Sequence, residues 1–164
     1  MACPLPTASA PDLYVSDGYR VRLAPGVLAK ALRLARVRAP LETGGLLLGD
    51  VVDGEAHVLT ITGPGRRAVH GRVGYDADRA HDNRLLARVY PRLRYLGDWH
   101  THPGGPARLS RTDEASVRES LRANRPEVLH LLLSGPSAMQ GHVVASVFAA
   151  VLGEPAIRRM EVVS

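Results

Sequence analysis

The chain has 164 residues, of which 45% are hydrophobic and 23% are charged, and its formal net charge is +5 at pH 7. These values are typical of one soluble globular domain, and they exclude a disordered or collagen-like chain. No apolar run approaches the roughly 20 residues that a membrane-spanning helix needs, and a (β/α)8 barrel would need about 200 residues or more.

The excess of basic residues does not by itself indicate a nucleic-acid-binding protein. Lysine and arginine total 21 residues against 16 acidic ones, but they are scattered through the chain. The cluster of Lys30, Arg33, Arg36 and Arg38 has the spacing of a solvent-exposed helix side. We therefore interpret the charge as a solvated surface, and we expect neither a nucleic acid nor a membrane as partner.

Residues 1–11 are rich in proline and alanine, and we expect them to form a flexible N-terminal tail before a domain at 12–164. Cys3 is the single cysteine of the chain, so no internal disulfide can form and an oxidising compartment is not indicated. The tail also lacks the basic segment and apolar stretch of a secretory signal, which favours a cytoplasmic protein.

The hydrophobic pattern of the first half predicts three strands and one helix. The strands are expected at 19–23, 41–49 and 51–62, and the helix at 25–38. Asp50 or Asp53-Gly54 would join the second and third strands as a hairpin. Residues 63–74, rich in glycine and arginine, are expected to form a loop or an irregular strand.

The second half predicts two more helices and four more strands. In chain order we expect a helix at 76–93, a strand at 93–99, a loop at 100–109, a helix from 110 to about 124, and strands at 128–133, 143–152 and 157–163. The uniformly apolar strand at 143–152 is expected in the centre of the sheet. Together these elements predict an α/β (α+β) fold with a mixed central sheet flanked by about three helices.

The most informative segment is 97–103, with the sequence Gly-Asp-Trp-His-Thr-His-Pro. Residues two apart on a strand point to the same side, so His100 and His102 can present both imidazoles to one metal ion. Seven residues separate His102 from Ser110, and if Ser110 begins a helix, Asp113 lies one turn in and can point back at the strand end. Two imidazoles and one carboxylate leave a fourth position on zinc for water, which a catalytic site requires.

The spacing of Ser110 and Asp113 also fits a capping box, in which each side chain bonds the backbone amide of the other residue. Taken alone, this pattern favours capping over catalysis, and a His-x-His pair alone is weak evidence for a metal. The combination favours a metal site, because capping gives no reason for a histidine pair at this distance. A metallo-β-lactamase pattern does not fit, since it needs an aspartate where this chain has Gly104.

These residues resemble the JAMM motif of the JAB/MPN+ metalloproteases, and segment 97–103 is similar to the prokaryotic members of that family. The family also has a glutamate on an earlier strand, just before a glycine-rich apolar stretch. Glu42 has this position in segment 41–49, Leu-Glu-Thr-Gly-Gly-Leu-Leu-Leu-Gly. The order of the predicted elements from residue 19 onward is also similar, so the resemblance covers most of the chain.

The resemblance implies one Zn²⁺ per chain, bound by His100, His102 and Asp113 with water as the fourth ligand. Glu42 would take a proton from this water and return it to the departing amine. The Ser110 hydroxyl would donate a hydrogen bond to the developing oxyanion. The chain would thus be a zinc metallo-isopeptidase, a hydrolase of the deubiquitinase type.

Similar enzymes cleave the amide bond after the C-terminal glycine of ubiquitin or a ubiquitin-like protein, whose tail pairs as an added strand in a narrow groove. The resemblance implies such a partner here, for deconjugation or maturation. Activating- and conjugating-enzyme-like proteins of an antiphage system, or a sulfur-carrier system, would accompany it. We expect residues 63–74 or 136–141 to flank the groove. Cleavage of an isopeptide bond and of a linear peptide bond both stay open at this point.

Two alternative functions belong to other classes. Many MPN domains are metal-free scaffolds that only assemble complexes, but they lack some of the ligands that this chain keeps. A nucleic-acid-associated relative of the JAB fold would need a coherent basic surface, which the scattered arginines do not predict.

Several polar or aromatic residues near the motif are expected to have structural roles. On a regular strand Trp99 and Thr101 point away from the metal, so we expect Trp99 in the core and Thr101 to steady the loop. The other histidines lack ligand spacing: His57, His70, His81, His130 and His142. Because His130 lies in an apolar strand, we expect it to be a hydrogen-bonded core residue.

Overall fold

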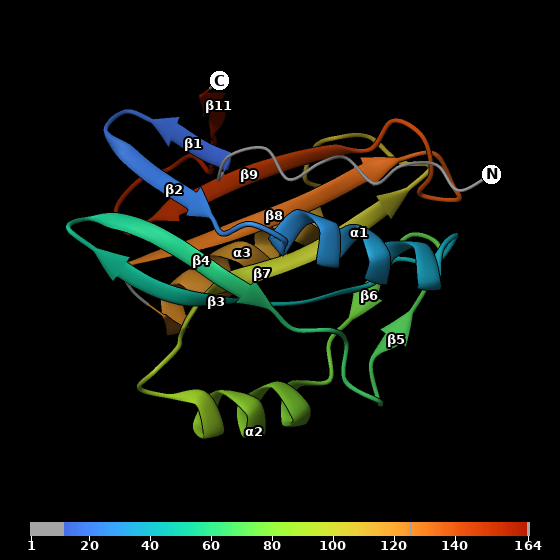
Figure 1. Cartoon of the computed structure of the whole chain (residues 1–164), viewed down its shortest axis with the longest axis horizontal. Coiled ribbons are helices and arrows are strands. Elements are labelled where there is room, and N and C mark those ends of the chain that lie inside the picture. The colour runs from blue at the N-terminus through green and yellow to red at the C-terminus, as the bar shows by residue number, and fades with distance from the viewer. Residues whose placement is uncertain (1–11, 125, 164) are drawn as a thin grey trace.

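The described residues, 12–124 and 126–163 of a computed structural model, form a mixed sheet of nine strands with three helices (Figure 1). The predicted tail at 1–11, including Cys3, lies outside these residues. The strand order in the sheet is β10-β9-β8-β7-β3-β4-β2-β1-β11, and β5 and β6 form a separate pair. The predicted α+β fold with a mixed sheet is confirmed.

The helices and strands have the following bounds. The strands are β1 (Asp12–Ser16), β2 (Tyr19–Leu23), β3 (Gly44–Val52), β4 (Glu55–Ile61), β5 (Val69–His70), β6 (Tyr75–Asp76), β7 (Arg94–Pro103), β8 (Glu127–Gly135), β9 (Val144–Val151), β10 (Arg158–Arg159) and β11 (Glu161–Val163). The helices are α1 (Val27–Arg38), α2 (Arg79–Val89) and α3 (Arg111–Ala123). Within the described part of the chain, no helix combines the length and the apolar composition that crossing a bilayer requires.

The C-terminal segment determines the shape of the sheet. Neighbouring strands run antiparallel except for two parallel pairs, β2 with β4 and β7 with β8. Only Met160 separates β10 from β11, yet β10 pairs with β9 and β11 pairs with β1, at opposite ends of the strand order. The two edges of the sheet are therefore brought together, and Met160 is buried in the apolar core between them.

Local sequence signals place two elements where they are predicted. Asp53 and Gly54 have positive φ angles of 50° and 78° and join β3 to β4, as the hairpin signal predicts. Ser110 is the N-cap of α3, because its hydroxyl accepts a hydrogen bond of 3.1 Å from the Asp113 amide. Both elements follow from short-range contacts, which the sequence encodes directly.

Two strands differ from the prediction, one because it was not predicted and one because it is longer. β1 is absent from the sequence-based assignment, although Asp17-Gly18, with φ angles of 44° and 81°, joins it to β2 by the same type of hairpin signal. β7 continues to Pro103, so the predicted loop from residue 100 is wrong. The reason is tertiary, since β7 pairs with the parallel strand β8 as far as Gly135.

Two further predictions need correction. Strand 143–152 corresponds to β9, which is next to the end of the sheet because only the two-residue strand β10 follows it. The helix predicted at 76–93 is shorter, because α2 begins after its N-cap Asp78 and ends two residues before Pro91.

The two faces of the sheet are covered differently. On one face, α1 packs against a large apolar core, and Leu129, Leu131 and Leu133 of β8 point into it. On the other face, α3 packs against a smaller cluster that includes Val128. Because side chains alternate along a strand, His130 shares this second face with Val128. The predicted ligands lie here.

Candidate metal centre

Strand β7 places two buried histidines side by side. His100 and His102 are 6% and 8% exposed, and their Nε2 atoms lie 2.9 Å apart. Trp99, which alternates with them, is part of the apolar core on the opposite face, as predicted. The pleat of one strand thus separates the core side chain from the candidate ligands.

The first turn of α3 brings Asp113 to the histidine pair. Its Oδ1 lies 3.3 Å from His100 Nε2, and its Oδ2 lies 3.2 Å from His102 Nε2. Asp113 Oδ2 also accepts a hydrogen bond of 2.7 Å from the Ser110 amide, which completes a capping box. The two interpretations of this spacing are therefore compatible, because the cap that starts the helix also holds the carboxylate toward the histidines.

The outer nitrogen of each imidazole has a partner that orients the ring. His102 Nδ1 lies 3.1 Å from the Pro106 carbonyl oxygen. Because a carbonyl only accepts, Nδ1 of His102 donates to it, and Nε2 is left to bind a metal or, in the metal-free protein, to donate to Asp113. His100 Nδ1 lies 2.5 Å from Nε2 of His130, which can accept in the same way. Burial, together with His100 nearby, lowers the pKa of His130 well below its ordinary value, which favours this neutral acceptor.

These donors fit a zinc ion. In a tetrahedral site with metal–ligand distances of about 2.0–2.1 Å, neighbouring ligand atoms lie about 3.3 Å apart. The closest separations among His100, His102 and Asp113 are 2.9, 3.2 and 3.3 Å. Two neutral imidazoles and a carboxylate are also ligand types found in catalytic zinc sites. Without a metal ion, protons on the imidazoles would have to hold these three groups together.

Glu42 lies beside this cluster and is held there through its backbone. Candidate ligand atoms of Glu42, His100 and His102 all lie within 4.8 Å of one another. The Glu42 amide donates to the Gly71 carbonyl at 2.8 Å, and the Glu42 carbonyl accepts from His70 Nδ1 at 2.9 Å. Strand β3 begins two residues later, so the hairpin of β5 and β6 and the sheet together position this carboxylate.

Thr101 locks the start of β3 to β7. The Thr43 amide donates to the Thr101 hydroxyl at 3.0 Å, and the Thr101 amide donates to the Thr43 carbonyl at 3.0 Å. The predicted role of Thr101 was to steady the following loop, but these contacts hold the residue after Glu42 instead. The glutamate and the two histidines are thereby kept in one register.

The electrostatics of the cluster follow from burial and from the close charges. Burial raises the pKa of Glu42 to about 7, although His102 opposes the shift. Burial acts in the same direction on Asp113, but hydrogen bonds from His100 and His102 hold the pKa of Asp113 well below its ordinary value. The hydrogen bond to Asp113 raises the pKa of His102. A carboxylic acid that titrates near neutrality can both accept and release a proton in that pH range.

Ser110 lies at the edge of this arrangement. Among the described contacts, its hydroxyl takes part in the cap of α3, and no contact brings it to the histidines. The two segments expected to flank a groove lie near different parts of the centre. Residues 63–74 include β5 and bond the Glu42 backbone, whereas 136–141 follows β8 and contains Ser137, which packs against Gly104 in the loop after β7.

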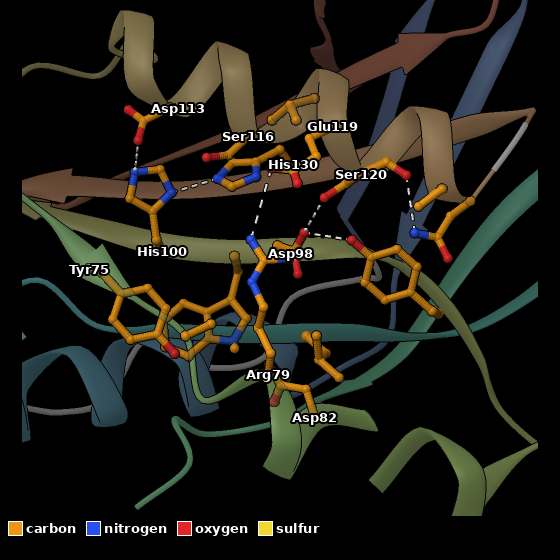
Figure 2. A pocket seen from close by; sticks show the side chains of 18 of the residues that line it. Tyr75, Arg79, Asp82, Asp98, His100, Asp113, Ser116, Glu119, Ser120 and His130 are labelled. Atoms are coloured by element: carbon orange, nitrogen blue, oxygen red, sulfur yellow. Dashed lines mark hydrogen bonds and ion pairs between the residues drawn. The ribbon is translucent and has the colours of Figure 1, made fainter. Parts of the chain in front are cut away.

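A cavity of about 440 Å³ extends from the cluster between α2, β7 and α3 (Figure 2). His100 and Asp113 line it at the cluster, and Asp98 of β7 lines it further along. The Tyr95 hydroxyl donates to Asp98 Oδ2 at 2.5 Å, and the Ser120 hydroxyl lies 3.4 Å from the same oxygen. The centre therefore opens into a space large enough for part of a substrate.

Sequence reasoning missed the contacts of two histidines. His130 is expected in the core, yet it contacts His100, because β8 pairs in parallel with β7 and sets His130 opposite Asp98. A polar residue in an otherwise apolar strand beside the motif strand was the available signal. His70 carries no such signal, because its contact with Glu42 depends on how the hairpin folds back.

Comparison with known proteins identifies relatives of this chain. A family model described as prokaryotic homologs of the JAB domain matches residues 25–155. A probable metalloprotease of Sinorhizobium fredii is 34% identical over 114 residues, which cover 62% of this chain and 68% of that protein. A CD-NTase/cGAS isopeptidase of Enterobacter hormaechei is 32% identical over 128 residues, which cover 74% of this chain and 69% of that protein.

A solved structure of a protein from Desulfitobacterium hafniense has a similar fold. The TM-score is 0.62, the sequence identity is 20%, and the match covers 84% of this chain and 87% of that one. At this identity the likeness concerns the fold alone. It agrees with a mixed sheet and three helices.

Proposed function

The chain belongs to the family of prokaryotic homologues of the JAB domain, and on this basis we propose that it is a zinc-dependent isopeptidase or peptidase. Its substrate would be the amide bond after the C-terminal glycine of a ubiquitin-like protein. The observation that carries the proposal is the convergence of His100, His102 and Asp113, with Glu42 beside them. No apolar packing requires this group of polar side chains to be buried together.

In this proposal His100, His102 and Asp113 hold one zinc ion per chain. The ion would supply Lewis acidity, which lowers the pKa of water and polarises a carbonyl. The contacts of His102 with Pro106 and of His100 with His130 keep both Nε2 lone pairs turned inward. The capping box likewise holds the Asp113 carboxylate toward the two imidazoles.

Glu42 would be the general base and then the general acid. It removes a proton from the attacking water as the new carbon–oxygen bond forms, and it delivers that proton to the nitrogen of the departing amine as the carbon–nitrogen bond breaks. In the metal-free protein burial raises the pKa of Glu42 to about 7, and a zinc ion nearby would lower it toward the carboxylate form that accepts a proton. The Ser110 hydroxyl, whose oxygen accepts the Asp113 amide, would turn its own proton toward the developing oxyanion.

The substrate class is supported by the relative from Enterobacter hormaechei, which is named an isopeptidase. An extended tail could pair with the two-stranded sheet of β5 and β6, which is tied to the Glu42 backbone. We also propose residues 12–164 as the catalytic domain, a cytoplasmic location, and activating- or conjugating-enzyme-like proteins as companions.

The test uses Glu42→Gln as a trap. The variant and the wild-type chain are purified, their zinc is counted by elemental analysis, and the variant is incubated with lysate of the source organism for mass spectrometry. We expect one zinc in each protein, and a small protein that ends in glycine bound to the variant. The wild type should then release product from this substrate, and the rate of release should be about 10²- to 10⁴-fold lower with Glu42→Gln.

Glu114→Gln is the matched control, because Glu114 is exposed on α3. The substitution makes the same change of charge as Glu42→Gln, at a side chain outside the predicted metal centre. Its turnover should equal that of the wild type. An active Glu42→Gln variant would contradict the role of Glu42, and a protein that binds no zinc would contradict the metalloenzyme.

A further inference from the structure

The lining of the cavity beside the metal centre has more acidic than basic residues. Its lining carries five carboxylates and a single arginine. Three of these acids lie away from the predicted ligands and Glu42, namely Asp82 of α2, Asp98 of β7 and Glu119 of α3. They come from three separate elements, so the topology, and not one acidic stretch of sequence, brings them to the same space.

Asp82 is the least expected of these residues. It is 8% exposed, and it is the buried residue of an otherwise exposed or half-buried helix. Among the described residues its carboxylate has neither a hydrogen-bond donor nor an ion-pair partner, although it lines the cavity. Burial raises the pKa of Asp82 above its ordinary value, His81 and Arg79 oppose the shift, and Asp78 adds to it. The carboxylate oxygens of Asp82 are not closed off from solvent, so water or a ligand in the cavity has to supply their partners.

The helix dipole accounts for only part of this placement. An acidic residue in the first turn of a helix is stabilised by the dipole, but an exposed position in that turn would serve equally well. Asp98, across the cavity, has hydrogen bonds from Tyr95 and Ser120 to its Oδ2 alone. The lining's one guanidinium, that of Arg79, is 76% exposed and reaches Glu119 at 3.9 Å (Figure 2). Among the described residues, neither Asp82 nor Asp98 has a cation within ion-pair distance, although Arg79 is near enough for its charge to oppose the raised pKa of Asp82.

We propose that Asp82 and Asp98 form a subsite for a cationic side chain, a guanidinium or an ammonium, of the substrate whose scissile bond lies at the metal centre. The inference rests on the proposed function and names a residue type that the substrate tail should carry. Tyr75, Leu86 and Tyr95 line the same cavity and offer apolar and aromatic surface to the aliphatic part of such a side chain. Arg79 and Glu119 stand at the exposed side, where entry occurs.

Cleavage of matched peptides tests the subsite. The series ends in Gly-Gly-7-amino-4-methylcoumarin, and one arginine moves through the four positions before the glycines, with alanine elsewhere. A second series carries citrulline, which has the shape of arginine without its charge. We expect the wild type to cleave one arginine peptide with a kcat/KM about tenfold or more above that of its citrulline partner.

Variants assign the preference to the two acids. Asp82→Asn and Asp98→Asn should lower the ratio of kcat/KM for the preferred arginine peptide to kcat/KM for its citrulline partner, from about tenfold toward one. Asp53→Asn is the matched control, because Asp53 is exposed in the turn between β3 and β4 and tolerates Asn at its positive φ. Thermal melting of each variant checks that the fold is kept.

Binding separates failure of the subsite from failure of the proposed function. Zinc-loaded Glu42→Gln is titrated with labelled peptides that end in a Gly-Gly carboxylate, and anisotropy is recorded. Cleavage without any preference for charge would overturn the subsite and leave the proposed function intact. If no peptide is cleaved, the proposed function fails for this substrate class. In that case the subsite is still supported if the arginine peptide binds more tightly than the citrulline peptide and Asp82→Asn abolishes the difference. Equal binding of both series would overturn it.

Discussion

The two faces of the sheet divide stability from chemistry. On the face with α1, buried residues form one large apolar cluster, to which the helix contributes Val27, Ala31 and Ala35. On the opposite face, α3 contributes only Val117 and Leu121 to a small cluster, and α2 buries a carboxylate instead of an apolar side chain. Figure 1 shows α1 lying along the sheet, while α2 stands away from it.

The difference shows what a functional face costs and what it provides. Among the described residues, the apolar cluster on the face with α1 contains nineteen buried side chains, which can stabilise the fold through burial alone. The other face leaves a cavity of about 440 Å³ unfilled and buries histidines and acids beside it. Each buried polar group reduces stability unless it is paired, so this face depends on the first for a stable frame.

The largest effect on activity is expected from Asp113→Ala. The change removes one predicted zinc ligand and leaves the face with α1 untouched, so zinc content and activity should fall together, activity by about 10³-fold or more. Elemental analysis and product release measure the two quantities. Asp113→Ala also removes the capping box, so its melting temperature is compared with that of the metal-free wild type. A variant that kept both zinc and turnover would contradict the assignment of Asp113.

The complementary change is Leu131→Ala, on the face with α1. Leu131 is fully buried, so the cavity left behind should lower the free energy of unfolding by about 2–5 kcal/mol, measured in urea. Zinc stoichiometry of the folded protein should stay unchanged. Leu59→Ala, at a residue that is 49% exposed, is the control and should change stability by about 0.5 kcal/mol or less. Loss of zinc with Leu131→Ala would show that the two faces are not separable.

A smaller effect is expected at His130, which lies behind the predicted ligand His100 on the face with α3. His130→Ala removes the partner of His100 Nδ1, and zinc affinity should fall about 10- to 100-fold in competition with a chelator. His130→Gln, whose carbonyl oxygen can accept the same proton, should restore part of the affinity. Affinities equal to wild type in both variants would mean that His130 only fills space.

The smallest effect concerns the ion pairs of Glu55 with Arg20 and Arg22, outside both the apolar core and the metal centre. Arg22, then Arg20, lower the pKa of Glu55 from 4.5 to about 2. The folded state thus favours the ionised form, and its contribution to stability is present above pH 4.5 and is lost as the pH falls toward 2. The stability difference between wild type and Glu55→Gln should shrink over this interval, and high salt should reduce it at neutral pH. A difference independent of pH would contradict this origin.

Most elements follow from local patterns in the sequence, and the errors have tertiary causes. Helix α3 follows from Ser110 and from its apolar spacing, and the hairpin of β3 and β4 follows from Asp53-Gly54. The length of β7 could not be read in this way, because its last residues become a strand only by pairing with β8. The position of β9 in the strand order depends on its neighbour β10, which has two residues and therefore no hydrophobic pattern that the sequence could show.

In the candidate site, too, some features follow from the local sequence and others from the tertiary structure. By itself, the sequence determined the motif of Glu42, His100, His102, Ser110 and Asp113 and the family that it resembles, because residue type and spacing along one strand and one helix turn are local properties. Only the tertiary structure decided which groups stand behind and beside these residues. His130 and His70 reach the centre through strand pairing and hairpin folding, and Asp82 and Asp98 share a cavity because α2 and β7 pack across it. Contacts between segments distant in sequence depend on the relative placement of whole elements, and no short pattern encodes that placement.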